Sequence, residues 1–251
     1  MSQRVSELLQ RCGTDTPVLP PTELYNEGWM LRLVLDWFES RPDVDHPLRF
    51  HPDARWYSEA LLASRFLPTR RGDPLGESFT HADGVIGHFD IRPGERGEAT
   101  AQPDARQLIV IEAKMGSGLS RGVKNAPDYG QASRNVACMA HALEVAGARP
   151  EQFDSLAFYV VAPQSQIEAG AFRDLVTHDG IRSQVAARVD QYDGRHGEWF
   201  EERFLPTLEW MELGLISWEE LVDFIDGEER QGELTEFYSG CLKFNPLRAR
   251  K

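Results

Sequence analysis

Cysteine is scarce in this chain of 251 residues, and its few copies form no pattern. Cys12, Cys138 and Cys241 are odd in number, lie far apart and include no Cys-x-x-Cys pair. Disulfide frameworks and zinc or iron–sulfur sites need paired or closely spaced cysteines. The sequence therefore predicts buried or free thiols rather than a cysteine-based scaffold.

Long apolar runs are also lacking. No segment approaches the roughly 20 consecutive apolar residues of a membrane-spanning helix. Residues Met1–Thr16 are polar and charged, without the apolar core and cleavage site of a signal peptide. We therefore expect a cytoplasmic protein with no membrane partner. The length suits one sizeable domain, and 41% apolar with 27% charged residues is normal for a globular chain with a real core.

Positive charge is in short supply. The net charge is −13, which argues against broad, nonspecific affinity for nucleic acid. Acidic residues crowd into Glu198–Glu236, opposed only by Arg203 and Arg230, whereas Lys243–Lys251 carries four basic residues and no acidic one. A nucleic-acid site must therefore be local and lie away from the acidic C-terminal region. The acidic helices expected there could instead form a homodimer or bind a protein partner.

Several catalytic signatures are missing as well. The sequence contains no Gly-x-Ser-x-Gly elbow, no phosphate-binding P-loop, no Gly-x-Gly-x-x-Gly and no His-Glu-x-x-His. A metal-independent enzyme of unrelated chemistry consequently has little support.

The pattern of apolar and turn-forming residues predicts an α/β protein, with a mixed central sheet flanked by helices. After a polar segment (residues 1–21) with a short helix and a proline-rich link, we expect a core over 22–163 and a helical extension over 164–251. In the core the pattern predicts helices over Glu23–Ser40 (capped by Thr22), Arg55–Leu67 and Asp128–Val145, and strands within Ser78–Ile91, over Gln107–Met115 and over Ser155–Ala162. Residues 93–106 are expected to form an exposed loop. In the extension we expect helices near 166–176, 180–192, 198–213, 218–226 and 232–243.

The chain is organised around Gln107–Met115. Leu108–Ile111 is a β-branched, apolar run typical of a buried central strand, and Glu112 and Lys114 follow it without a turn signal. Residues two apart on a strand point to the same face. Two charges side by side there are costly to bury unless they pair or hold a ligand. The pair is compatible with a structural ion pair at a sheet rim or with a functional site.

A predicted hairpin decides which aspartate joins this pair. If the strand ending at Ile91 pairs antiparallel with the Gln107–Met115 strand, the start of the first lies opposite the end of the second. Asp83 then comes near Glu112 and Lys114, whereas Asp90 lies about 23 Å away, at about 3.3 Å per residue. We therefore choose Asp83 and interpret Asp90 as a solvated residue at the rim.

Two helices bring further polar side chains. Glu27 falls on the apolar stripe of the first helix, between Leu24 and Leu31, and can either reach water at its edge or meet a cation. Gln131 lies in the first turn of the helix that follows the Gln107–Met115 strand. That helix lies between two strands, so a right-handed crossover is expected to make the Ser155–Ala162 strand parallel to the earlier one.

This ordered set resembles the PD-(D/E)xK nuclease superfamily. Ala82-Asp83 stands where that family has Pro-Asp, Glu112-Ala113-Lys114 matches its Glu-x-Lys half, and Gln131 and Glu27 occupy the places of a helical glutamine and a first-helix glutamate. The resemblance covers roughly residues 22–163. It implies a restriction-endonuclease-like core, in which a helix, a three-stranded meander, a helix and a strand follow one another.

The resemblance also implies a chemistry. A Mg²⁺ ion, with Mn²⁺ as a substitute, would activate a water molecule for phosphodiester hydrolysis and relieve phosphate charge. Asp83, Glu112 and the Ala113 carbonyl would be metal ligands, and Glu27 would hold a second metal or a metal-bound water. Lys114 would orient the attacking water, and Gln131 would position Lys114 or a phosphate. The expected activity is a nuclease, with DNA ahead of RNA as substrate. The alternative is a catalytically inactive nuclease-like fold that binds nucleic acid or protein.

Overall fold

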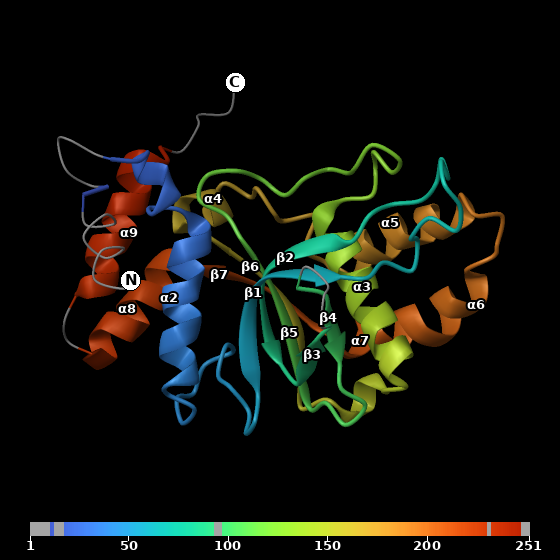
Figure 1. Cartoon of the computed structure of the whole chain (residues 1–251), viewed down its shortest axis with the longest axis horizontal. Coiled ribbons are helices and arrows are strands. Elements are labelled where there is room, and N and C mark those ends of the chain that lie inside the picture. Colours follow the sequence, from blue (N-terminus) through green and yellow to red (C-terminus); the bar gives the residue numbers. More distant parts are fainter. Residues whose placement is uncertain (1–10, 13–17, 93–96, 230–231, 247–251) are drawn as a thin grey trace.

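A five-stranded sheet forms the centre of the molecule, with helices on both of its faces (Figure 1). The computed structural model describes residues 11–12, 18–92, 97–229 and 232–246. The short helix expected within residues 1–20 falls mainly outside the described residues. None of the helices in these ranges combines the length and the apolar composition that a membrane crossing needs. Cys12, Cys138 and Cys241 are all buried, and Cys138 and Cys241 are free thiols, as predicted.

The sheet is mixed, which confirms the predicted α/β class. Its strand order is β1-β2-β5-β6-β7. β1, β2 and β5 are antiparallel neighbours, whereas β6 and β7 run parallel to β5. The predicted antiparallel pairing of β2 with β5 and the predicted parallel pairing of β5 with β6 are both confirmed. The strands are β1 Arg55–Leu62, β2 Thr80–Gly87, β3 Phe89–Ile91, β4 Ala99–Ala101, β5 Gln107–Ala113, β6 Ser155–Ala162 and β7 Glu212–Ser217.

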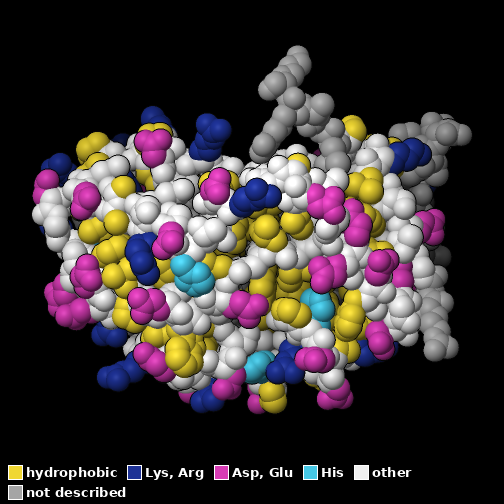
Figure 2. Space-filling model, turned by 180° about the vertical axis from the view of Figure 1, so that it is seen from behind, with side chains coloured by type: hydrophobic (Ala, Val, Ile, Leu, Met, Phe, Trp, Pro, Cys, Tyr) yellow, Lys and Arg dark blue, Asp and Glu magenta, His cyan; other side chains and the backbone are white. Residues whose placement is uncertain are grey.

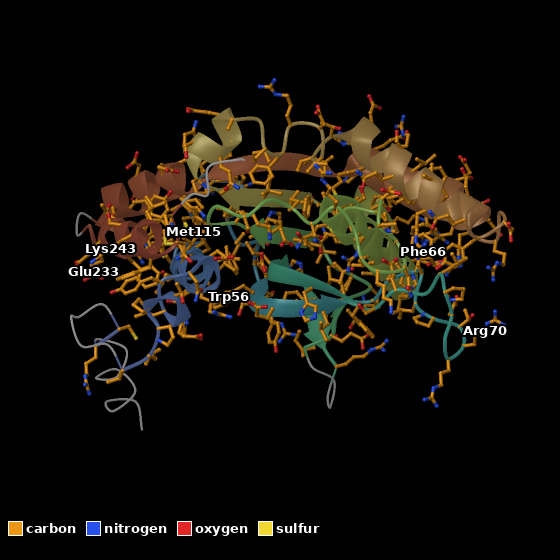
Figure 3. The ribbon with its side chains drawn as sticks, turned by 90° about the horizontal axis from the view of Figure 1, so that it is seen from above. Trp56, Phe66, Arg70, Met115, Glu233 and Lys243 are labelled. Carbon is orange, nitrogen blue, oxygen red and sulfur yellow. The ribbon has the colours of Figure 1, made fainter. Side chains whose placement is uncertain are left out.

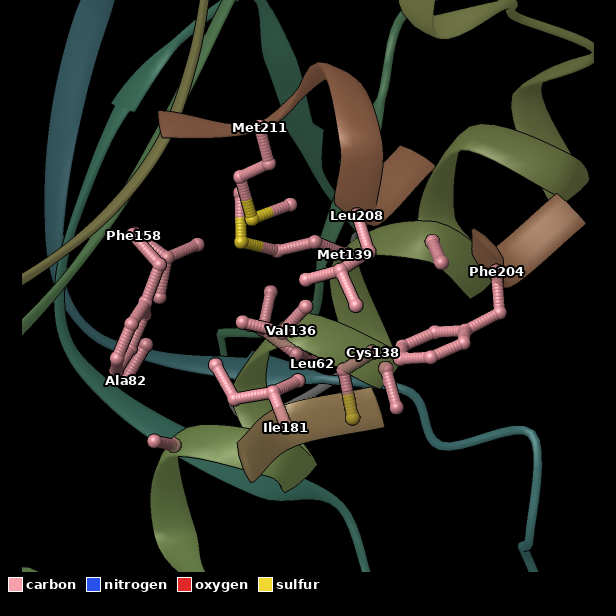
Figure 4. Close-up of a cluster of buried hydrophobic side chains, with 14 of the residues drawn as sticks. Leu62, Ala82, Val136, Cys138, Met139, Phe158, Ile181, Phe204, Leu208 and Met211 are labelled. Carbon is pink, nitrogen blue, oxygen red and sulfur yellow. The ribbon is translucent and has the colours of Figure 1, made fainter. Parts of the chain in front are cut away.

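The helices bury one apolar cluster on each face of the sheet. On one face lie α2 (Glu27–Glu39), α8 (Trp218–Glu229) and α9 (Glu233–Phe244), and on the other lie α3 (Gln131–Ala146), α5 (His178–Asp190) and α7 (Leu205–Trp210). Seen from above, Met115 and Phe66 lie on opposite sides of the sheet (Figure 3). The α3-side cluster brings Val136 and Met139 against Phe158 and Met211 (Figure 4). The remaining helical segments are η1 Pro21–Glu23, η2 Pro150–Gln152, α4 Gln164–Glu168, α6 Gly197–Trp199 and a π-helical turn Phe200–Phe204.

Helices α2 and α3 begin later than expected. The Asn26 side chain accepts a hydrogen bond from the Trp29 N–H at 2.9 Å and so caps α2, in place of Thr22. α3 begins at Gln131 rather than Asp128, and ends at Gly147, whose φ of 68° is the left-handed conformation that glycine allows. The helices themselves are confirmed, and their starting residues are corrected.

The prediction of a helix over Arg55–Leu67 is wrong, because this segment contains β1. Its second half is rich in helix-forming residues. Pairing with β2 nevertheless makes it a strand at the edge of the sheet, because tertiary contacts override the local preference for a helix. The continuous strand expected up to Ile91 is also broken after Gly87. Its last part, β3, pairs with β4, a strand within the segment predicted to be a loop.

The C-terminal region is not purely helical. The helix predicted over 198–213 ends at Trp210, and β7 joins the sheet beside β6. Gly214 permits this pairing, since a Cβ there would lie 2.8 Å from the Tyr159 ring. Ser217 caps α8, because its hydroxyl accepts a hydrogen bond from the Glu220 N–H at 3.0 Å.

Candidate functional site

Strand β5 presents Glu112 and Lys114 to the α3 side of the sheet. Leu108 and Val110 pack in the α3-side cluster, whereas Ile109 and Ile111 pack on the α2 side. Glu112 continues the α3-side series, and its side chain is only 1% exposed. Lys114 follows two residues later with a side chain 10% exposed, so both charges are largely removed from water.

Asp83 lies where β2 separates from β5. The register between these strands ends at Gly84 opposite Ile111. Two residues further along β5, the Ala113 N–H donates to the carboxylate Oδ2 of Asp83 at 2.7 Å, in place of a backbone carbonyl of β2. Because the N–H and C=O of one strand residue lie on the same edge, the Ala113 carbonyl is directed to this side too. Strands β2 and β5 therefore diverge beyond Gly84 and Ile111, and the Asp83 side chain lies in the fork between them.

A left-handed residue stands opposite Asp83 on β1. Glu59 has a φ of 57°, between the pairs Ser58–Gly84 and Ala60–Ala82. The Ser58 hydroxyl and the Glu59 carboxylate both contact Arg32 of α2, although consecutive strand residues normally face opposite sides.

This conformation shifts the alternation of the edge strand. Ala60 consequently packs in the α3-side cluster. A non-glycine residue in this conformation costs free energy, and such residues cluster at functional sites.

The Lys114 ammonium lies between the two carboxylates. It donates a hydrogen bond to Glu112 Oε1, and its Nζ is 3.8 Å from Asp83 Oδ2. The predicted grouping of Asp83, Glu112 and Lys114 is thus present in the structure. When both carboxyl groups are ionised, the two carboxylates and one ammonium leave one net negative charge, which suits a cation.

Helix α3 supplies two amides to the same carboxylate. Gln131 Nε2 donates to Glu112 Oε1, while Gln131 Oε1 accepts from the Ser120 N–H at 3.1 Å. Gln131 therefore joins Glu112 to the segment after β5. Asn135, one turn later, donates from Nδ2 to Glu112 Oε2 at 3.2 Å. Asn135 was not predicted from the sequence, although its spacing of four from Gln131 puts it on the same helix face.

The surroundings of Glu112 favour its neutral form. Burial, and then the negative charge of Asp83, raise the pKa of Glu112 to about 8, against the opposing effect of Lys114. A carboxyl group that changes charge near neutral pH, beside an ammonium and a second carboxylate, is a recognised feature of functional sites.

Glu27 is not joined to this group by any hydrogen bond or ion pair within the described residues. It is the first residue of α2 and half-buried. Burial, and then the charge of Glu27, raise the pKa of the Cys241 thiol on α9 to about 12. Glu27 thus acts electrostatically on α9, and its role towards a metal stays a prediction.

Asp90, interpreted as a solvated rim residue, is exposed in the structure, and the nearby His88 bonds to the backbone. Asp90 lies on the exposed rim, 3.8 Å from Arg55 and bonded to Gln102 at 3.1 Å. His88 accepts from the Gln107 N–H at 3.1 Å and contacts the Pro52 carbonyl at 2.9 Å, so both ring nitrogens serve the backbone.

The donor set determines which metal the site fits. Within the described ranges no three or more His, Cys, Asp or Glu side chains form a group that could hold a metal ion. Asp83, Glu112 and the Ala113 carbonyl offer oxygen ligands alone. Mg²⁺ uses one or two carboxylates and keeps several waters, so a pair of carboxylates with a carbonyl fits Mg²⁺ better than a metal that needs a full protein cage.

Comparison of the chain with protein-family models, with curated proteins and with solved structures gives no match. The residues of the site are therefore the basis for any statement about function.

Proposed function

We propose that this protein is a Mg²⁺-dependent nuclease, which hydrolyses phosphodiester bonds of nucleic acid, with DNA ahead of RNA. The observation that carries the proposal is the meeting of Asp83, Glu112 and Lys114 at the fork between β2 and β5. These three side chains are the ones that phosphodiester hydrolysis with an oxygen-bound metal would use.

The order of elements supports a restriction-endonuclease-like core. α2 is followed by the antiparallel neighbours β1, β2 and β5, then by α3, and then by β6 parallel to β5. This succession of helix, meander, helix and strand is the one that the resemblance implies. β7 and the C-terminal helices would then be additions to the core.

Each side chain has a distinct part in this proposal. Asp83 and Glu112, with the Ala113 carbonyl, would hold Mg²⁺, which when bound lowers the pKa of a water ligand and polarises the phosphate. Lys114 is held next to both carboxylates, so its ammonium can donate to a water or to a phosphoryl oxygen as negative charge develops there. Gln131 fixes Glu112 from one end of its amide and the Ser120 backbone from the other.

Substrate contacts must be local. Acidic and basic side chains alternate over the face shown in Figure 2, where the described residues form no continuous basic field. The segment after β5 carries two exposed basic residues, Arg121 and Lys124. They follow closely after Ser120, whose N–H donates to Gln131. Contacts from such side chains to phosphates would position a strand without reading its sequence.

The test is cleavage of single- and double-stranded DNA and RNA with Mg²⁺ or Mn²⁺. Lys114→Ala should lower the rate by at least about 100-fold, because removal of one charge-stabilising donor costs that much in comparable sites. Lys243→Ala, on the exposed face of α9, is the matched lysine control and should leave the rate unchanged. Equal rates in the protein and in Lys114→Ala would reject the assignment of the site.

A second candidate is a catalytically inactive fold that binds nucleic acid or protein. The enclosure of the Glu112 side chain, with donors on both of its oxygens, favours it, since a structural ion pair would look the same. The acidic region of α8 and α9 would then be the surface for a homodimer or a protein partner. Mn²⁺ titration separates the two candidates. A nuclease should bind Mn²⁺ and lose this affinity in Asp83→Ala, whereas the inactive fold should show no such loss.

A further inference from the structure

Asn135 is a polar side chain at a position where an apolar one would pack. It is 0% exposed and lies in the second turn of α3, among buried residues such as Ala132, Val136 and Met139. An asparagine favours neither a helix interior nor a dry environment. Its place in the core therefore needs a reason other than packing.

The hydrogen bonds of Asn135 fix its amide in one orientation. Nδ2 donates to Glu112 Oε2 at 3.2 Å and to the backbone carbonyl of Gln131 at 3.3 Å. Turning the amide over would place Oδ1 against these two acceptors. In the observed orientation Oδ1 is buried and finds no partner within the described part of the chain. The residue thus leaves one polar atom unsatisfied while the other contacts Glu112, which is unfavourable for stability alone.

The carboxylate of Glu112 is not equally occupied at its two oxygens. Among the described residues, Oε1 accepts from both Lys114 Nζ and Gln131 Nε2, whereas the donor to Oε2 is Asn135 Nδ2. Each carboxylate oxygen offers about two acceptor positions. Oε2 is therefore the oxygen that could bind a cation without losing a protein donor, and Asn135 sets the direction of its remaining position.

We propose that Asn135 is a positioning residue, which holds Glu112 so that Oε2 is presented to a divalent cation. The inference rests on the proposed metal-binding function and adds a residue that acts through Glu112 rather than on the substrate. Side chains that orient a metal ligand in this way commonly change metal affinity by 10- to 100-fold.

The experiment compares Asn135→Leu with Ser133→Ala in the full chain. Leucine has the same branched arrangement of side-chain heavy atoms as asparagine, but no donor. Ser133 is the matched control, because it is buried on the same helix and its hydroxyl bonds Gln184 Oε1 at 2.9 Å, away from Glu112. Mn²⁺ affinity is measured by calorimetry, and the Glu112 carboxylate is located in metal-free crystals of each variant. Asn135→Ala replaces Asn135→Leu if the latter fails to fold.

The expected result is Mn²⁺ binding at least about tenfold weaker in Asn135→Leu than in Ser133→Ala, with the Glu112 carboxylate rotated from its original place. Unchanged affinity, an equal loss in Ser133→Ala, or an unmoved Glu112 would overturn the inference. If the unaltered protein binds no Mn²⁺, the proposed nuclease function fails. The position of Glu112 in the metal-free crystals then decides alone whether Asn135 holds it.

Discussion

Replacing Glu112 by glutamine should change how the stability of this protein depends on pH. Burial and Asp83 raise the pKa of Glu112 from its ordinary value of 4.5 to about 8. Between these values the folded chain keeps a proton on Glu112 that the unfolded chain has released. Its contribution to the free energy of unfolding is therefore fully present below pH 4.5 and is lost as the pH rises to about 8.

The size of the effect follows from the same two values. The free energy of unfolding should fall by about 1.4 kcal/mol per pH unit inside this window, and by about 5 kcal/mol across it. Glu112→Gln has no such proton. The free energy of unfolding of the variant, relative to the original protein, should thus rise with pH at this rate.

Urea unfolding between about pH 6 and pH 8, with EDTA present, measures this difference directly. Asp90→Asn is the matched control, because an exposed carboxylate is hydrated in the folded and the unfolded chain alike. A difference between Glu112→Gln and the original protein that stays constant with pH would refute the reasoning. It would mean that the ion pair with Lys114 keeps Glu112 charged.

Two further predictions concern the α2 side of the sheet. Gly84→Ala should lower the free energy of unfolding by about 1–3 kcal/mol, because its Cβ would lie 3.0 Å from Leu31 Cδ2 and 3.1 Å from Leu35 Cδ1. Gly118→Ala, with nothing within 4 Å, should have little effect in the same urea experiment. Burial between Phe38 and Phe224 lowers the pKa of His46 from 6.5 to about 4. The free energy of unfolding should therefore fall as the pH drops through this range, because only the unfolded chain gains the proton there. His46→Asn can still accept the hydrogen bond from the Leu48 N–H and should weaken this dependence; thermal unfolding at the two pH values tests it, and an unchanged dependence would contradict the assignment.

The centre of the fold could be predicted from the sequence because its signals are strong and local. The apolar run of β5, the run of β6 and the helix between them together require a parallel crossover. The hairpin then brings Asp83 to Glu112 and Lys114 by strand geometry alone. Gln131 follows because it opens the helix that covers this end of β5.

The edges of the sheet could not be predicted in the same way. β1 contains a helix-favouring Glu-Ala-Leu-Leu run, and only its partner β2 makes it a strand. β7 is six residues long and includes a glycine, so it carries little periodicity of its own. The left-handed conformation of Glu59 has no signature in the sequence, since a glutamate does not mark a left-handed position as a glycine does. Asn135 was missed because an asparagine in an alanine-rich helix reads as a surface residue until its burial is known.

The segment after residue 163 contacts the backbone of the candidate site. The Trp218 indole N–H donates to the Lys114 carbonyl at 2.8 Å, and β7 closes the free side of β6. A shortened chain that stopped after β6 would bare a row of unpaired amides along an apolar strand, which invites association between copies. It would also lose the hydrogen bond from Trp218 to the backbone carbonyl of Lys114. The end of β5 therefore depends on the region after residue 163 for part of its support.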